Sequence, residues 1–529
     1  MNTYRKSRQA SSAKGAGVRN GRISTPRFKL LPAAIFLNLA VAAAMAAPAL
    51  AAGTDGTRID LAGTCTGYSL TPADAPNIPS IVAGKASGTV FCFGPGTYRM
   101  TKNIQPKSSD QLIGAGATRS DVILTGAKPI TAWTLTGGLY VHSGDVVSLP
   151  KAGNCFTGTA CQYADSVFKN DNVLTRSLSP CSLTNVTVGK YCVDYTTKQI
   201  YVFDNPAGQN LEYSFVPSAI GSSTGITIKD MTITKYANTD GSAAVVRLGD
   251  SSTMDNVEMS DNHACAVSLS GITGTVVENS RLDFQGGEGY CGTSTGATFT
   301  NNEVDHNNTL GFKASFMGGG GKFWNVQNAT VTDNYIHDNN GNGIWFDGDS
   351  KGNTISGNTT TNNSSIYGAG NGITYEVSCY ATILGNTSSG NGMAGIQVND
   401  AHNNTVGAAG AGNTITGNLK YGIRVVAGRT GTHPLCGTVT ASNNHVNYNS
   451  ISMPIGTSWT GVQRVSPAVA TGNSFSGNDY HLPLVTDCGT GLRWKWWDGG
   501  AMHSLKFSGT GAWQAGYNQD QPPDGTCGV

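Results

Sequence analysis

The sequence predicts an all-β solenoid, in which short strands stack as successive coils around one apolar interior. Three observations lead to this prediction. Of 529 residues, 70 are glycine and only 13% are charged, a composition typical of repeat proteins made of strands and turns. Between residues 321 and 422, a Gly-Ile segment with alternating apolar residues recurs. A Thr-Ile-x-Gly-Asn segment recurs between its copies, which indicates stacked supersecondary units.

Residues 1–52 have the features of a secretion signal. Residues 1–51 carry eight basic and no acidic residues, and an apolar run from Leu30 to about Ala46 precedes small residues that fit cleavage after Ala51 or Ala52. The alternative is an uncleaved anchor, although the run is short for a membrane span. The remaining 26 basic and 33 acidic residues do not indicate nucleic-acid binding. We therefore expect a secreted or periplasmic monomer that does not contact the membrane after cleavage.

All twelve cysteines follow this signal, and an even number in an exported chain favours disulfides. None shows the paired C-x-x-C spacing of a zinc site. The sequence leaves the connectivity open, and we expect neighbours in the chain to pair: Cys65–Cys92, Cys155–Cys161, Cys181–Cys192, Cys265–Cys291, Cys379–Cys436 and Cys488–Cys527.

The chain divides into three expected parts after the signal. Residues 53–225 form an irregular entry and N-terminal cap, with a small β insertion at about 140–216 that covers the open end of the solenoid. Residues 226–485 are the regular coils. Residues 486–529 form a C-terminal cap rich in tryptophan, for which the alternative is a sugar-stacking platform: Trp494, Trp496, Trp497 and Trp513.

Asparagine marks a recurrent turn in the regular part. Its spacing fits a coil of about 22–24 residues with inserted loops. Asparagines at matching turns would stack, each side-chain amide bonding the next, and this would satisfy buried turn backbone. The marker residues are Asn279, Asn302, Asn334, Asn358, Asn386 and Asn418.

The alternation of apolar residues predicts which side chains face outward. Pairs such as Ile344 and Phe346 recur at i and i+2, as one buried strand face requires. The residues between and after them then form two outward ladders. The first contains Lys322, Trp345, Thr374, Gln397 and Arg424, and the second contains Trp324, Asp347, Glu376, Asn399 and Val426.

The second ladder places two carboxylates on adjacent coils. Parallel strands lie about 4.8 Å apart, so Asp347 and Glu376 would be neighbours, and their like charges would raise the pKa of one of them. Retaining glycosidases hold their two carboxyl groups roughly 5–5.5 Å apart. Asp349 is a reserve carboxylate. Trp345 would give a flat apolar face for a sugar ring, and Lys322 and Arg424 would bind hydroxyls or an acidic group of the substrate. The six ladder residues that we expect to contact the substrate are Lys322, Trp345, Trp324, Gln397, Asn399 and Arg424.

Two alternatives apply to this cluster. Its carboxylates could bind a structural Ca²⁺, since hard cations prefer clustered carboxylate oxygens, or they could be plain surface residues. We otherwise expect no cofactor. His306 and His337 are interpreted as turn residues, and the long loops 307–321 and 362–370 either form walls of a cleft or are neutral insertions.

The pattern from about residue 80 to residue 485 resembles the right-handed parallel β-helix superfamily, the pectate-lyase-like fold of carbohydrate-active enzymes. Ile344-Trp-Phe-Asp347 followed by Thr374-Tyr-Glu-Val377 resembles the W-L-D-W and F-x-E-V segments of β-helix glycoside hydrolases that act on xylosides and related sugars. The resemblance implies that Asp347 is the nucleophile and Glu376 the general acid/base. The chain departs from the motif at Gly348 and Cys379, where the family has Trp and commonly His.

Three functions therefore remain from the sequence. The first is a secreted glycoside hydrolase acting on a polysaccharide or oligosaccharide. The second is a polysaccharide lyase or uronate epimerase of the same fold. In such an enzyme a Lys, Arg, His or Tyr abstracts the proton α to a uronate carboxylate, and a cation or basic group neutralises that carboxylate; Lys322 and Arg424 with the acidic cluster would serve. The third is a glycan-binding surface protein without catalysis.

Overall fold

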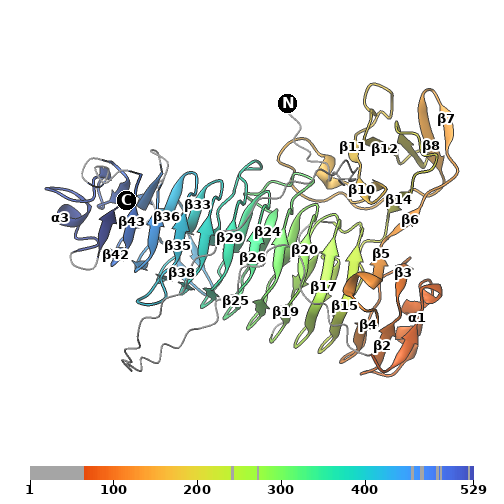
Figure 1. Cartoon of the computed structure of the whole chain (residues 1–529), viewed down its shortest axis with the longest axis horizontal. Coiled ribbons are helices and arrows are strands. Elements are labelled where there is room, and N and C mark those ends of the chain that lie inside the picture. The colour runs from red at the N-terminus through yellow and green to blue at the C-terminus, as the bar shows by residue number, and fades with distance from the viewer. Residues whose placement is uncertain are drawn as a thin grey trace, which may run out of the picture. The chain divides into compact units, whose positions relative to one another are not determined.

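The computed structural model describes residues 65–239, 243–270, 273–429, 431–453, 458–464, 470–483, 488, 491–521 and 525–528. This part of the chain is a right-handed parallel β-helix, as predicted (Figure 1). The expected signal at residues 1–52 lies outside the described residues. Within the described residues, no helix is long and apolar enough to span a bilayer.

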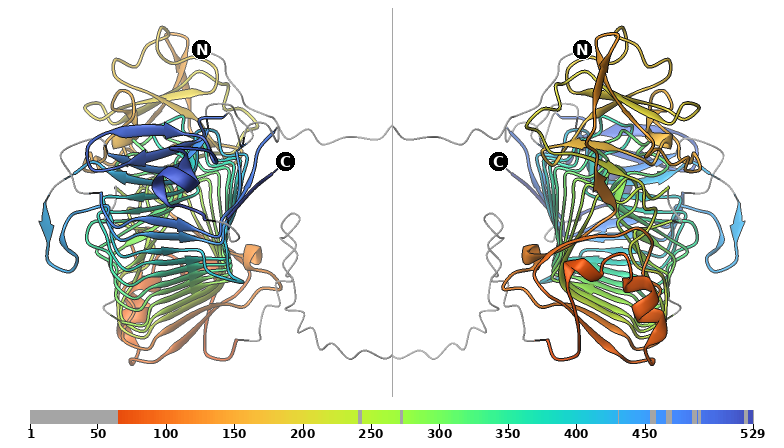
Figure 2. Two further views of the ribbon diagram at one scale, coloured as in Figure 1. Left: turned by 90° about the vertical axis from the view of Figure 1, so that its left-hand side faces the viewer. Right: turned by 90° about the vertical axis from the view of Figure 1, so that its right-hand side faces the viewer.

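Each regular coil contributes one strand to a front sheet and two short strands to the back of the β-helix. Seen along the β-helix, the coils superimpose (Figure 2). The front sheet has eleven strands: β16 (Val246–Leu248), β18 (Val267–Leu269), β21 (Glu288–Gly292), β24 (Gly319–Trp324), β27 (Asn342–Asp347), β30 (Ile373–Glu376), β33 (Ala394–Asn399), β36 (Tyr421–Ala427), β41 (Trp459–Arg464), β44 (Trp494–Trp497) and β45 (Met502–Leu505).

The back strands form two rows that share one continuous sheet, because β15 (Thr227–Thr234) and β17 (Thr253–Ser260) run through both rows. The first row is β19 (Val276–Glu278), β22 (Thr298–Thr300), β25 (Thr330–Thr332), β28 (Thr354–Ser356), β31 (Thr382–Leu384), β34 (Thr405–Val406), β39 (His445–Asn447) and β42 (Ser474–Ser476). The second row is β20 (Arg281–Asp283), β23 (Glu303–Asp305), β26 (Tyr335–His337), β29 (Thr359–Thr361), β32 (Thr387–Ser389), β35 (Thr414–Thr416), β40 (Ser450–Ser452), β43 (Asp479–His481) and β46 (Thr526–Gly528).

The interior is filled by the apolar residues of all three rows. Ile344 and Phe346 of the front sheet belong to the same core cluster as Val331 and Ile336 of the back rows, and all four are fully buried. The aromatic residues stack from coil to coil: the rings of Phe323 and Phe346 lie 5.2 Å apart, and those of Phe346 and Tyr375 5.7 Å apart. Because each coil has only one layer of such residues, it depends on its neighbours for burial.

Two asparagine ladders run along the turns that bound the second back row. Each side-chain oxygen accepts the backbone N–H of the residue one coil earlier, for example Asn334 N–H to Asn358 at 3.1 Å and Asn339 N–H to Asn363 at 3.3 Å. The first ladder is Asn302, Asn334, Asn358, Asn386, Asn413, Asn449 and Asn478, and the second is Asn307, Asn339, Asn363, Asn391 and Asn418.

Two of the predicted marker residues were therefore wrong. Asn279 has a left-handed backbone (φ 52°) and bonds Asp255 outside the ladder, whereas Ser280 donates its N–H to Asn302. Asn418 belongs to the second ladder. The Thr-Ile-x-Gly-Asn motif does not distinguish the ladders, because strands of both back rows end in the same kind of short turn.

The N-terminal part contains the entry coils and the insertion. The entry comprises β1 (Tyr68–Leu70), α1 (Ile78–Gly84), β2 (Val90–Phe93), β3 (Gly96–Arg99), β4 (Gln111–Gly114) and β5 (Val122–Thr125). The insertion, expected at about 140–216, consists of two small sheets whose strands begin at residue 127: β6 (Ala127–Pro129), β7 (Thr134–Thr136), β8 (Leu139–Ser143), β9 (Val167–Lys169), β10 (Asn172–Val173), β11 (Thr175–Ser177), β12 (Lys190–Asp194), β13 (Gln199–Val202) and β14 (Leu211–Ser214).

The C-terminal tryptophans close the interior of the β-helix. β44 extends the front sheet, and β46 extends the second back row. Trp494 and Trp513, the latter in α3 (Trp513–Tyr517), are fully buried against the last coil. Trp494 and Trp513 therefore form part of a buried C-terminal cap, and their rings are not available to stack on a sugar.

All six predicted disulfides are confirmed: Cys65–Cys92, Cys155–Cys161, Cys181–Cys192, Cys265–Cys291, Cys379–Cys436 and Cys488–Cys527. Six disulfides fit an extracellular or periplasmic location.

The first asparagine ladder allows a test of stability. Asn358 is fully buried, and its side chain bonds Asn334, Asn386 and the carbonyl of Val331. We expect Asn358→Ala to lower the free energy of unfolding by about 1–3 kcal/mol, because it leaves buried polar groups unpaired. Chemical denaturation measures the change. Asn447→Ala, on an outward and partly exposed position of β39, is the control, and an equal effect of both changes would contradict a special role of the ladder.

Candidate active site

The strand register of the front sheet confirms the two outward ladders. Lys322, Trp345, Thr374, Gln397 and Arg424 are register partners on consecutive strands. In the second ladder, Trp324 pairs with Asp347, and Glu376 pairs with Asn399, which pairs with Val426. Phe346 of β27 pairs with Tyr375 of β30, so Asp347 and Glu376 follow at the next position of these adjacent strands.

Asp347 lies at the end of β27 beside a cation. Its Oδ2 is 2.7 Å from Nζ of Lys322, and its Oδ1 accepts the backbone N–H of Gly348 at 2.7 Å. The Asp347 side chain retains 19% exposure, and that of Lys322 retains 12%. The lysine and the backbone N–H thus fix the position of the Asp347 carboxylate at the surface of the front sheet.

Glu376 is more deeply buried, with 6% exposure. The indole N–H of Trp345 donates to its Oε2 at 3.1 Å, and the amide of Asn399 donates to its Oε1 at 2.8 Å. The guanidinium of Arg429 forms an ion pair with the same Oε1. Strand residues therefore fix the position of Glu376, and a loop residue completes its surroundings.

The pKa of Glu376 is raised above its usual value. Burial is the largest cause, and the charge of Asp347 adds to it. Arg429, Lys322 and the hydrogen bond from Asn399 act in the opposite direction without reversing the shift. The two carboxyl groups therefore have different surroundings: Asp347 is paired with a lysine, and burial raises the pKa of Glu376.

Trp345 does not offer the open apolar face that we expected. It is only 3% exposed, and Nζ of Lys322 lies 3.9 Å from its ring centroid. The lysine covers the ring because it reaches across it to Asp347. Trp345 therefore acts on Glu376 through its N–H. Trp324 is also partly buried and packs beside the Cys265–Cys291 disulfide.

Arg424 and Gln397 bond to each other and to the following coil. One amino nitrogen of Arg424 donates to Oε1 of Gln397 at 3.2 Å, and its Nε donates to Oε1 of Gln463 at 3.1 Å. Its guanidinium carbon lies 4.3 Å from the ring centroid of Tyr421. Arg424 thus extends the polar surface of the front sheet beyond Glu376, where its contacts hold it in place.

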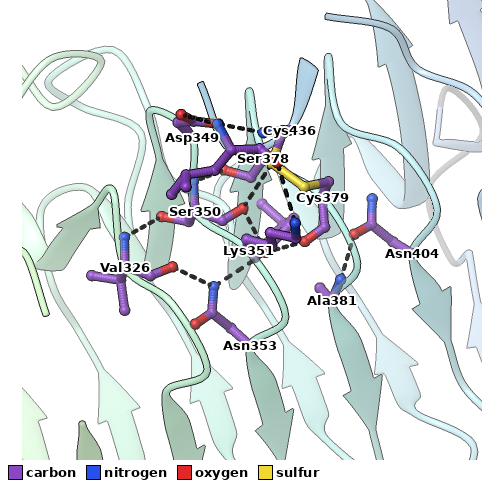
Figure 3. The surroundings of a disulfide bond; sticks show 12 residues. Val326, Asp349, Ser350, Lys351, Asn353, Ser378, Cys379, Ala381, Asn404 and Cys436 are labelled. Carbon is purple, nitrogen blue, oxygen red and sulfur yellow. Dashed lines mark hydrogen bonds between the residues drawn. A yellow bond between two sulfur atoms is a disulfide. The ribbon is translucent and has the colours of Figure 1, made fainter. Parts of the chain in front are cut away.

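Asp349, the reserve carboxylate, is a clamp for a distant loop (Figure 3). Its two oxygens accept the backbone N–H groups of Leu435 and Cys436, each at 2.8 Å. Cys436 is bonded to Cys379 in the next coil. Both oxygens are occupied and the side chain is buried, which fits a positioning role, and the reserve catalytic role of Asp349 stays a prediction.

The clamped loop carries Arg429, which sequence reasoning missed. The N–H groups of Gly428 and Arg429 donate to Oδ1 of Asp400, the latter at 2.9 Å, so the loop is fixed near both ends. The Arg429 side chain is 56% exposed. The signal that could have revealed it was the predicted Cys379–Cys436 disulfide, which draws this loop toward the Glu376 coil.

A hollow of about 390 Å³ lies between the loop and the turns that follow β24 and β27. One of the residues that line it is Gly348, which follows Asp347 and donates its N–H to that side chain. Its lining residues are Asn325, Gln327, Gly348, Asp349, His433, Pro434 and Leu435.

Two other clusters have metal-binding residue types. Cys265 and Cys291 lie beside Glu288, but their sulfurs form a disulfide and are not available as thiolates. Glu303, Asp305 and His337 converge on the second back row, where Arg281 pairs with Asp305 at 3.1 Å. At the front sheet, where we considered Ca²⁺, Lys322 and Arg429 form ion pairs with Asp347 and Glu376.

The two histidines interpreted as turn residues differ in position. His306 follows β23 with a left-handed backbone (φ 54°) and is a turn residue, as expected. His337 is the last residue of β26, where it contacts Asp338 at 2.8 Å and Glu303 at 3.4 Å. Both lie on the second back row, outside the front sheet.

Comparison with known proteins supports the fold. Residues 242–408 match the family model of the right handed beta helix region. No curated protein matches the chain. A solved structure of XylC in complex with xylose is similar, with a TM-score of 0.60 and 13% identity, over 79% of this chain and 84% of that one.

Two further solved structures have lower TM-scores. The A-module of the Azotobacter vinelandii mannuronan C-5 epimerase AlgE6 has a TM-score of 0.41 and 12% identity, over 87% of this chain and 98% of that one. A glycoside hydrolase has a TM-score of 0.35 and 10% identity, over 74% and 88%. The family-model match and the XylC structure, together with the sheet topology, confirm the predicted right-handed parallel β-helix at the level of the fold.

Replacing Asp349 tests whether it is a clamp or a catalyst. We expect Asp349→Ala to loosen the loop around residues 431–439 and to lower turnover by no more than about 10²-fold, the scale of a slightly misplaced site. Limited proteolysis should show faster cleavage in this loop. If turnover is abolished, as for Asp347→Ala, while the loop stays resistant, Asp349 has a catalytic role instead.

Replacing Arg429 tests the electrostatics of Glu376. Arg429 lowers the pKa of Glu376, so its removal raises that pKa further. We expect Arg429→Gln to move the alkaline limb of kcat/KM to higher pH, because this limb reports loss of the proton from the acid of the free enzyme. Arg247→Gln, an exposed arginine of β16, is the control. A limb that stays in place or moves to lower pH would contradict this assignment.

Proposed function

We propose that the protein is a retaining glycoside hydrolase, with Asp347 as the nucleophile and Glu376 as the general acid/base. One observation carries the proposal: two carboxyl groups occupy corresponding positions on adjacent strands, one paired with Lys322 and the other buried with a raised pKa. A charged carboxylate beside a protonated carboxylic acid is the combination that glycoside cleavage requires.

The spacing of the coils favours retention of configuration. Neighbouring strands lie about 4.8 Å apart, near the 5–5.5 Å between the carboxyl groups of retaining enzymes. Inverting enzymes need roughly 6.5–9.5 Å to admit a water molecule between carboxylate and sugar. A pair on adjacent strands is therefore closer to the separation of retaining enzymes than to that of inverting ones.

The reaction then has two steps. Glu376 donates its proton to the glycosidic oxygen, the bond to the leaving group breaks, and Asp347 forms a bond to the anomeric carbon. In the second step Glu376 takes a proton from water, whose oxygen attacks the anomeric carbon and releases Asp347. Trp345 and Asn399 hold Glu376 in place, and Lys322 holds Asp347 through an ion pair. This sequence uses no cofactor.

A β-xyloside is the first substrate to test. The Trp-Phe-Asp and Tyr-Glu-Val segments resemble those of β-helix enzymes acting on xylosides, and the similar XylC structure contains xylose. The chain differs from that motif at Gly348 and Cys379, where it instead forms the hollow and the disulfide. Because the chain differs from the motif at these two positions, other pentosides and hexosides are tested as well.

The proposal is tested with residues 53–529 on 4-nitrophenyl glycosides and on plant and bacterial polysaccharides, with and without chelator. We expect new reducing ends without ultraviolet absorbance, and no effect of the chelator. An unsaturated product that absorbs in the ultraviolet would instead identify a lyase, and dependence on a cation would favour the Ca²⁺ alternative. Glycan binding without turnover would favour a binding protein.

Variants of the two carboxylates distinguish their roles. With an activated aryl glycoside, Glu376→Ala should slow turnover by about 10²–10⁴-fold. Azide should restore turnover and give a glycosyl azide of retained configuration, because it attacks the covalent intermediate on Asp347. Asp347→Ala should be inactive, and azide should give the inverted product. If Asp347→Ala gives the retained azide product and Glu376→Ala the inverted one, the two roles are reversed. If azide restores turnover in neither variant, the mechanism is contradicted.

A further inference from the structure

Three loops that are distant in the sequence meet beside the starts of β24 and β30. One belongs to the insertion, around residues 153–158, and the others are 308–318 and 362–371. The N–H of Phe156 donates to the carbonyl of Gly311 at 2.9 Å, and that of Lys313 donates to Asn154 at 2.7 Å. The N–H of Ala314 donates to Tyr367 at 2.9 Å. Backbone hydrogen bonds therefore fix the loops in one arrangement.

This arrangement leaves an aromatic shelf at the surface, formed by Phe156, Phe316 and Tyr367. Phe156 is 45% exposed and Phe316 51% exposed. The rings of Phe156 and Tyr367 lie 5.8 Å apart at an angle of 56°. The Cys155–Cys161 disulfide holds the loop that carries Phe156. Two exposed phenylalanines and one partly buried tyrosine are therefore carried by three loops that hydrogen bonds join.

The shelf is continuous with the carboxylate pair through Lys322. Nζ of Lys322 donates to the carbonyl of Phe316 at 3.1 Å and lies 5.7 Å from the Phe316 ring centroid. The same nitrogen is 2.7 Å from Oδ2 of Asp347. One lysine side chain therefore separates the aromatic shelf from the proposed nucleophile, and a ligand longer than one sugar reaches both.

We propose that the aromatic shelf binds a second sugar ring of an oligosaccharide whose reacting ring lies at Asp347 and Glu376. This inference rests on the proposed function and adds the length of the substrate to it. A pyranose presents a face of C–H groups that packs on an aromatic ring, while its hydroxyls remain in water. The rings are already in place, so binding costs little conformational entropy.

The geometry favours a sugar over a protein partner. The shelf consists of a few side chains at the edge of a polar surface, whereas a stable protein interface buries roughly 800 Å² on each partner. Polar groups also surround it: Lys313 and Ser315 are exposed on the same loop, and Lys322 lies at its inner end. A mixed apolar and polar surface of this size fits one ring with its hydroxyls.

The test compares 4-nitrophenyl β-xyloside, which provides one sugar, with xylotetraose, which extends past the carboxylates. For Phe316→Ala we expect KM for xylotetraose to rise by about tenfold, the scale of losing a well-placed aromatic contact, with kcat unchanged. KM for the chromogenic xyloside should stay constant. Phe156→Ala should act in the same direction, and Phe316→Tyr should restore the wild-type KM.

Phe203→Ala is the matched control, since Phe203 is an exposed ring of the insertion outside the shelf. It should leave both KM values unchanged, and thermal unfolding shows that each variant is folded. If Phe316→Ala changes KM equally for both substrates, or for neither, sugar binding at the aromatic shelf is contradicted, whereas the proposed hydrolase activity is not. A wild-type protein inactive on both sugars and on the wider panel would contradict the proposed function, and the shelf with it.

Discussion

Stacked asparagine side chains satisfy the buried backbone groups at the turns of the β-helix, and the register of the coils depends on this interaction. A coil of 24 residues, such as that from Asn334 to Asn358, has too small an interior to fold alone. Its turn N–H groups face inward, where an unpaired donor costs free energy. Because each asparagine bonds the next, neighbouring coils remain in register even where their loops differ in length. This register places Glu376 next to Asp347.

The repeating part of the molecule was predictable because its period is fixed by backbone geometry. The alternation of Ile344 and Phe346 sufficed to place Asp347 on the outer face, and the coil repeat placed Glu376 beside it. The disulfides followed from the order of the cysteines. Asn418 was misplaced because the turns at both ends of the second back row have the same sequence pattern, although they lie at different corners of the coil.

The parts that could not be predicted depend on loops and on long side chains. Arg429 lies beyond the end of β36, where no period applies, and it reaches Glu376 because Asp349 and Cys436 hold its loop. The burial of Trp345 depends on the path of the Lys322 side chain, which strand alternation does not determine. An outward position on a strand is therefore not the same as an exposed side chain, since neighbouring coils and loops can cover it.

Lys322 connects the features of the site. Its ammonium group pairs with Asp347, covers Trp345 and bonds the carbonyl of Phe316. The indole of Trp345 in turn holds Glu376, so the lysine contacts one carboxylate directly and the other through the tryptophan. Since Lys322 contributes a positive charge near both groups, it limits the rise in the pKa of Glu376 that burial and Asp347 cause.

The site thus consists of strand residues at fixed spacing and of surrounding loops whose length and sequence can vary. The spacing of the strand residues cannot change without breaking the register of the sheet. The loops are tied on one side by Asp349 and the Cys379–Cys436 disulfide and on the other by the insertion. Loops on a solenoid accept insertions at little cost, because the coils beneath them carry the stability. A change of sugar or of chain length therefore requires new loops around Asp347 and Glu376 and no change in their separation.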